Sequence, residues 1–276
     1  MSSSIPNVHK DHLEPRLPAD LERIIFDDVA RNNRGSIPKL MLVCQRAKYW
    51  TETILYSVII RNEDPSRPAY HPPIKRLPSY AHHVRHLLVY NDIEQSVIQD
   101  HLRLCKNMIN VALWHYNQSR DILELLEGLP HLRSLVVHLF ATFPGGPPTY
   151  ELGKSRMFRG LTHLEILDDV EKFSADQIRS LGELDNLTHF ALNSVRTDQI
   201  VLDILKVCQR VQVLVLHDSR FLDDWATFPK NRVVFGRSRV EDHVRDWVAF
   251  AEGRWCFWDE AEEQVQAEQN AHDSDS

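Results

Sequence analysis

The chain has 276 residues, 43% hydrophobic and 26% charged, a composition typical of a globular protein with one large domain or two small ones. A formal net charge of −7 argues against the basic excess that nucleic-acid binding usually needs, and no apolar run of 18 residues is present to span a membrane. The four cysteines are far apart and form no CxxC pair, which disfavours a zinc finger or a disulfide framework. No secretory leader opens the chain, so we expect a cytoplasmic or nuclear protein without nucleic-acid or membrane partners.

Residues 1–14 carry no apolar pattern, and we expect them to be disordered. Residues 15–60 contain two apolar segments with helical spacing, "LPADLERIIFDDVA" and "KLMLVCQRAKYW". Pro18 suits a helix start. The apolar face of the first helix is predicted to hold Leu21, Ile24, Ile25, Phe26 and Val29, and that of the second Leu40, Leu42, Val43, Cys44 and Trp50. So few short helices bury little core, which favours a partner for this module.

A Pro-rich stretch at 61–80 is expected to be a linker or loop, and a second loop is expected at 141–155. Between 81 and 236 an apolar-x-x-apolar-x-apolar motif recurs, with a period of 24 to 29 residues. The six copies are "VRHLLV", "MINVAL", "LRSLVV", "LTHLEI", "LTHFAL" and "VQVLVL", starting at residues 84, 108, 132, 161, 187 and 211. This period and motif are typical of leucine-rich repeats, here irregular ones. "NRVVF" at 231–235 is a candidate for a last, degenerate strand.

Apolar residues upstream of each motif have the spacing of a short helix, which includes Cys105 and Cys208 as buried small hydrophobes. A strand–helix unit cannot bury its apolar face alone, so neighbouring units must stack. The predicted fold is an α/β solenoid: a short helical N-terminal module followed by irregular leucine-rich-repeat-like units, with a curved parallel sheet and helices outside.

Alternation along the strands predicts which side chains face the concave side of the sheet. The mixture of histidines, aromatics and polar groups on that face is typical of a protein-binding surface. The candidate partner-binding residues are His86, Tyr90, Asn110, Trp114, His138, His163, Glu165, His189 and His217. His163 and His189 should lie about one strand spacing apart, but no thiolate accompanies them, and we expect neither a metal site nor a cofactor.

The C-terminal part divides into an aromatic segment and an acidic one. Residues 237–260 are expected to form a helical cap in which Trp247, Phe250, Trp255, Phe257 and Trp258 cover the open end of the solenoid; the alternative is an exposed aromatic binding patch. Residues 261–276 are expected to be a solvated, partly disordered acidic tail, the alternative being an acidic interaction tail. Cutting the chain after Gln266 should therefore change its stability little.

Catalytic motifs are absent or incomplete in the sequence. "PPTYELGKS" approaches a phosphate-binding loop, but Pro148 stands where the first glycine is needed and has no N–H to donate. "SIPK" at 36–39 matches Ser-x-x-Lys without the partner motifs of that enzyme class. We therefore expect a non-catalytic protein.

The opening hairpin at 17–57 resembles an F-box, which begins with Leu-Pro, continues with an acidic-apolar helix and closes with a Leu-x-Val-Cys…Trp helix. With the repeats and the ending "VRDWVAFAEGRWCFW", the chain resembles F-box proteins with irregular leucine-rich-repeat-like regions that are numerous in mushroom-forming fungi. The link "RNNRGSIPK" and the element "RAKYW" depart from the usual F-box pattern.

The resemblance implies a function. It implies a substrate-recognition subunit of a ubiquitin ligase, whose F-box docks onto a Skp-type adaptor and through it a cullin, while the repeats hold an unknown protein substrate. The implied adaptor-binding residues are Leu17, Pro18, Leu21, Ile24, Ile25, Phe26, Leu42, Val43, Cys44 and Trp50. The alternative is a non-catalytic repeat scaffold whose hairpin is only a structural cap.

Overall fold

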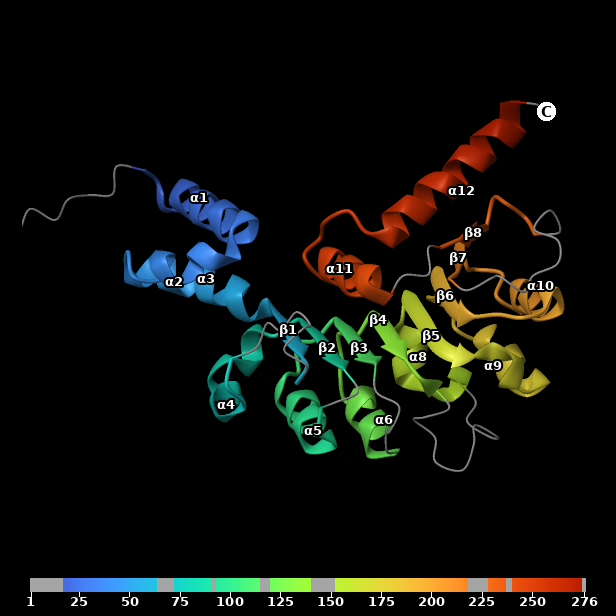
Figure 1. Cartoon of the computed structure of the whole chain (residues 1–276), viewed down its shortest axis with the longest axis horizontal. Coiled ribbons are helices and arrows are strands. Elements are labelled where there is room, and N and C mark those ends of the chain that lie inside the picture. The colour runs from blue at the N-terminus through green and yellow to red at the C-terminus, as the bar shows by residue number, and fades with distance from the viewer. Residues whose placement is uncertain are drawn as a thin grey trace, which may run out of the picture. The chain divides into compact units, whose positions relative to one another are not determined.

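The computed structural model describes residues 17–63, 72–90, 93–114, 120–139, 152–217, 228–236 and 240–274 (Figure 1). The segment 1–14, expected to be disordered, lies outside these ranges. The chain divides into two compact units, Met1–Leu55 and Tyr56–Ser276. Among the described residues, no helix has the length and apolar character needed to cross a membrane.

The N-terminal unit is helical, as the sequence predicts. It contains α1 (Ala19–Asn32), a 3-10 turn (Arg34–Ser36), α2 (Ile37–Leu40) and α3 (Gln45–Ser57), which runs into the second unit. Its core is small: Ala30, Ile37 and Ile54 are buried, with Leu40, Met41 and Leu55 partly buried around them. A core of this size leaves most of the apolar side chains of α1 in contact with solvent.

The second unit is built on an open, eight-stranded, all-parallel sheet in which the strands follow one another in chain order. The strands are β1 (Val58–Arg61), β2 (His86–Tyr90), β3 (Asn110–Trp114), β4 (Ser134–Val137), β5 (His163–Asp169), β6 (His189–Ser194), β7 (Val213–Leu216) and β8 (Val233–Phe235). The six motifs form β2 to β7, and "NRVVF" supplies β8. The sequence analysis missed β1, because its residues "VIIR" directly continue a helical pattern.

Helices connect the successive strands from β1 to β7, as parallel neighbours require. They are α4 (Leu77–Tyr80), α5 (Gln95–Leu104), α6 (Arg120–Glu127), α8 (Arg156–Gly160), α9 (Ala175–Leu181) and α10 (Asp198–Val207). Short 3-10 turns occur at Ile74–Arg76, Ala81–His83, Leu152–Lys154 and Val170–Lys172. These helices share one core with the strand residues of one sheet face, such as Leu87, Val111 and Leu135. Cys105 and Cys208 are buried in that core as predicted.

Two C-terminal helices, α11 (Val240–Ala251) and α12 (Phe257–Ser274), lie on the opposite face of the sheet (Figure 1). Val244 and Trp247 of α11 share a buried cluster with Leu88, Tyr90 and Ala112 of β2 and β3. Trp258, Ala261 and Val265 of α12 share another with Ala191 of β6 and Val215 of β7. The described part of the aromatic segment, 240–260, therefore packs on the face of the sheet, with Trp255 left exposed, and the expectation that the segment closes the open end is wrong.

The boundaries of three other segments differ from the sequence-based expectations. The linker expected at 61–80 contains the last residue of β1, and its part from 74 onward is helical; residues 64–71 lie outside the described ranges. Of the loop expected at 141–155, the part 152–154 is a 3-10 turn, and 140–151 are not described. The acidic segment 261–276 is helical as far as Ser274, and its start is packed on the sheet, so it is not a solvated tail throughout.

Candidate functional site

The N-terminal unit carries an exposed apolar surface. Ten large hydrophobic side chains of the described residues are exposed, and eight of these belong to this unit: Leu17, Leu21, Ile24, Ile25, Val29, Leu42, Val43 and Tyr49. Residues three and four apart share one face of a helix, so Leu21, Ile24, Ile25 and Val29 form a stripe along α1. Such a concentration of exposed apolar groups marks an interaction surface more often than a scattered set does.

Six of the ten residues implied to bind an adaptor are among these exposed hydrophobics, namely Leu17, Leu21, Ile24, Ile25, Leu42 and Val43, and Cys44 is also exposed. Pro18 is also exposed, while Phe26 and Trp50 are half-buried, with ring centroids 6.1 Å apart. The thiol of Cys44 accepts a hydrogen bond from the N–H of Ala47 at 3.4 Å, which caps the start of α3. Helix geometry places Leu21, Ile24 and Ile25 on the outer face of α1, but Leu42, Val43 and Cys44 lie in the turn between α2 and α3, so the prediction that they belong to the face of a second helix is wrong.

The strand residues expected to form a free partner-binding surface lie together on one face, but α11 and α12 cover that face. The alternation is confirmed: paired registers place His86 beside Asn110 and Tyr90 beside Trp114. Their exposure is not as expected, because Tyr90, Asn110, His138, Glu165, His189 and His217 are buried and His86, Trp114 and His163 are half-buried. The sequence signal that was overlooked is the apolar face of "VEDHVRDWVAFA", because such a face has to pack against another apolar surface.

One hydrogen bond fixes α11 on the middle of the sheet. The indole N–H of Trp247 donates to Oδ1 of Asn110 at 3.1 Å, and both residues are buried. The rings of Tyr90 and Trp114 meet edge to face nearby, with centroids 5.4 Å apart. These groups are interior contacts between α11 and the sheet.

His163 and His189 lie on paired positions of β5 and β6, as expected, with parallel rings whose centroids are 4.2 Å apart. Nε2 of His189 lies 2.7 Å from Glu262 Oε1 of α12, and Trp258 packs edge-on against both rings. Burial, and secondarily the neighbouring His189, lowers the pKa of His163 to about 3, against the opposing effect of Asp259. Burial also lowers the pKa of His189, although Glu262 opposes this. Both imidazoles are therefore neutral at pH 7 and form part of the packing under α12.

A second polar cluster, which the sequence analysis missed, lies at the β1 end of the sheet. Nε of Arg61 donates to His101 Nε2 at 3.2 Å, and its Nη2 donates to the hydroxyl of Tyr80 at 3.2 Å. Burial lowers the pKa of Arg61 and raises that of Tyr80. A buried arginine costs solvation free energy unless its donors are satisfied, and these two bonds satisfy part of the guanidinium. No sequence motif links residues 61, 80 and 101.

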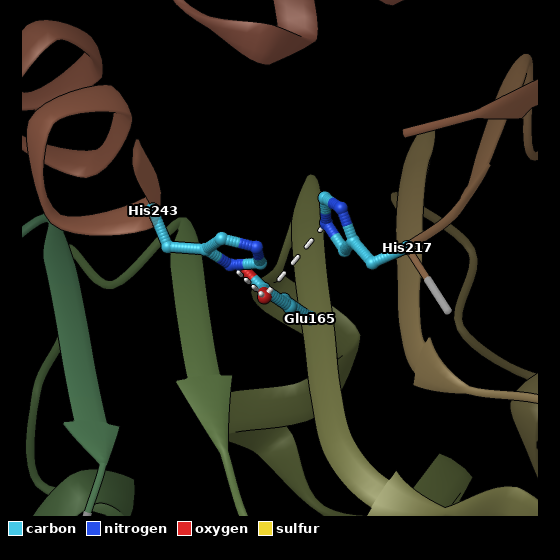
Figure 2. A group of neighbouring side chains, drawn as sticks. All are labelled: Glu165, His217 and His243. Atoms are coloured by element: carbon cyan, nitrogen blue, oxygen red, sulfur yellow. Dashed lines mark ion pairs between the residues drawn. The ribbon is translucent and has the colours of Figure 1, made fainter. Parts of the chain in front are cut away.

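A third cluster joins Glu165 of β5, His217 directly after β7 and His243 of α11 (Figure 2). The sequence analysis placed Glu165 and His217 on this face and did not single out His243. Nε2 of His217 and Nδ1 of His243 lie 3.9 and 3.8 Å from Oε1 of Glu165. These distances are longer than a hydrogen bond.

Comparisons with known proteins give weak structural similarity only. No protein-family model matches the chain, and no curated protein matches it. Among solved structures, the C-terminal domain of a tropomodulin from Caenorhabditis elegans is similar over 50% of this chain and 89% of its own length, at 14% identity and a TM-score of 0.34. This similarity carries no argument about function.

Proposed function

We propose that the chain is the substrate-recognition subunit of a ubiquitin ligase, with the N-terminal unit an F-box that docks onto a Skp-type adaptor and through it a cullin. The observation that carries the proposal is the exposed apolar stripe of α1, continued at Leu42 and Val43. Leu42 is 86% exposed and Ile24 62%, although both are apolar. An adaptor groove that removes this surface from water supplies the burial that the small core of the unit lacks.

In this proposal the second unit is a non-catalytic, leucine-rich-repeat-like solenoid that holds the protein substrate. The buried strand face beneath α11 and α12 is not itself the substrate surface while these helices are in place. A substrate would contact the helices α11 and α12, or displace them to reach Trp114 and its neighbours. The alternative function is a stand-alone scaffold in which the N-terminal helices bind no adaptor.

Co-expression of the full chain with a Skp-type adaptor tests the proposal. We expect a stable complex. We expect Ile24→Asp and Leu42→Asp each to weaken adaptor binding about 30-fold or more, because each change removes an apolar contact and would place a carboxylate in an apolar groove. Both side chains are exposed, so neither change should lower the melting temperature of the chain appreciably.

The matched control is Leu104→Asp, which changes an exposed leucine of α5 in the second unit and should leave adaptor affinity unchanged. The double change of Leu17 and Pro18 to alanine should also remove adaptor binding without altering the far-UV circular dichroism. Absence of any complex between the wild-type chain and the adaptor at micromolar concentration would exclude the ligase proposal and leave the scaffold.

A further inference from the structure

The cluster of Glu165, His217 and His243 brings three metal-ligating side chains together from three separate elements. One atom of each, a carboxylate oxygen or an imidazole nitrogen, lies within 4.8 Å of the others. Figure 2 shows the two imidazoles approaching the same carboxylate oxygen from α11 on one side and from the end of β7 on the other. Residues 165, 217 and 243 therefore converge on one point between the sheet and α11.

Polar atoms in this cluster are buried without hydrogen bonds. The side chain of Glu165 is 7% exposed and that of His217 is 3% exposed. Among the described residues, Oε1 of Glu165 and both ring nitrogens of His217 have no hydrogen-bond partner. A buried carboxylate oxygen without a partner costs solvation free energy, so something must compensate for it.

The sheet is built to allow this convergence. Glu165 and Val215 are both paired with Ala191 of β6, and His217 follows two residues after Val215, on the same face of the sheet. Gly236 follows β8, and a Cβ atom there would lie 2.6 Å from Nδ1 of His217. The imidazole of His217 therefore packs close to the backbone of Gly236, and its Nε2 lies 3.9 Å from Oε1 of Glu165.

We infer that Glu165, His217 and His243 form a binding site for a divalent transition-metal ion of the zinc type, which ties α11 to the sheet. Two imidazoles and one carboxylate are a ligand set that zinc accepts, with a water molecule in the fourth position. Calcium and magnesium are excluded, because they prefer oxygen ligands throughout.

Two of the three separations between the ligand atoms are close to those that the ion requires, and the third is within 4.8 Å. Tetrahedral zinc with bonds of about 2.0–2.1 Å separates neighbouring ligand atoms by roughly 3.4 Å. The separations of 3.8 and 3.9 Å therefore need to shorten by about half an ångström, which small side-chain rotations provide. An ion at this point satisfies Oε1 of Glu165 and Nε2 of His217 together.

Zinc titration of the untagged full chain, stripped with a chelator, tests the inference directly. We expect calorimetry to show one tight zinc ion per chain, and the melting temperature to rise by about 5–10 °C when free zinc is a hundredfold above its Kd. Magnesium at the same concentration should produce no rise. Cobalt in place of zinc should give the intense visible absorption of a four-coordinate ion.

Two variants attribute the ion to these ligands. Glu165→Gln keeps the shape of the side chain, and His243→Gln changes a residue at the edge of the site; each should weaken zinc binding at least about tenfold and remove the cobalt absorption. The melting temperature of Glu165→Gln without metal should equal or exceed that of the wild type, because a buried charge is removed. If the three residues only stabilised the fold and bound no metal, each variant would shift the melting temperature from that of the wild type by the same amount with and without zinc.

Two further histidine variants serve as controls. His131 is exposed and His189 lies under α12, and glutamine at either position should leave the zinc stoichiometry unchanged. The inference would be overturned if the wild type bound zinc no more tightly than surface histidines do. It would also be overturned if Glu165→Gln and His243→Gln bound zinc as the wild type does. The cluster would then be bridged by water or a proton only.

Discussion

At the scale of single residues, the buried contact between Trp247 and Asn110 decides how α11 sits on the sheet. The indole N–H is the only side-chain donor that Trp247 has, and it satisfies the amide oxygen of Asn110 at the start of β3. Two side chains that are 137 positions apart in the sequence thus meet in one hydrogen bond. Such a bond stabilises the fold because leaving a buried acceptor unpaired costs more than the bond itself contributes.

Trp247→Phe should destabilise the protein by about 2–4 kcal/mol, because it unpairs Asn110 Oδ1 and leaves part of the indole volume empty. Urea denaturation followed by tryptophan fluorescence and circular dichroism measures the change. Trp255→Phe is the matched control: Trp255 is 59% exposed, and its replacement should change stability by less than about 0.5 kcal/mol. Equal effects of the two replacements would mean that α11 is not packed on the sheet.

At the scale of elements, α12 differs from a solvated acidic tail in its first half only. Trp258, Ala261 and Val265 are buried against the sheet, and Glu262 reaches His189. Beyond Gln266, the described contacts are exposed ones, such as that of Gln269 with the backbone of Asn231. The acidic composition therefore predicts correctly that the second half of this helix is exposed to solvent, but not that the first half is buried on the sheet.

Two truncations separate the halves of α12. Ending the chain after Gln266 should lower the melting temperature by no more than about 2 °C, because no buried side chain is removed among the described residues. Ending it after Arg254 should lower the melting temperature by about 10 °C or more and should increase binding of an apolar dye, because Val213, Val215 and Val234 become exposed. If the shorter chain melts as the full chain does, α12 does not cover the sheet.

At the scale of the whole molecule, the histidines under α12 couple global stability to pH. Burial lowers the folded-state pKa of His163 from 6.5 to about 3 and also lowers that of His189. The unfolded chain binds protons near pH 6.5 and the folded chain does not, so the stability contributed by the neutral imidazoles is complete above pH 6.5 and is lost as the pH falls below it. Asp259 and Glu262 of α12 oppose this effect without reversing its direction.

The free energy of unfolding should fall by about 2 kcal/mol between pH 7 and pH 5, a window above most carboxyl titrations. Urea denaturation at half-unit steps of pH measures this slope. In His163→Gln the slope should be shallower, since one of the titrating groups is removed. A stability that stays constant or rises as the pH falls to 5 would show that the rings are accessible to solvent.

The sequence by itself determined the parallel strand–helix architecture and which strand residues share a face of the sheet. The motif spacing of 24 to 29 residues predicted β2 to β7, because period-two alternation within a strand and a helix between strands are local patterns. The same alternation placed His163 beside His189 and Tyr90 beside Trp114. The exposed stripe of α1 was likewise predicted from the spacing of Leu21, Ile24 and Ile25.

Only the tertiary structure decided which of these faces is free. An amphipathic helix reveals from its sequence that one side will be covered, but not which surface will cover it, because that choice depends on contacts between residues far apart in the chain. Trp247 could close the end of the sheet or lie on its face, and its bond to Asn110 selects the face. The same docking brings His243 to Glu165 and His217, a proximity that no spacing in the sequence encodes.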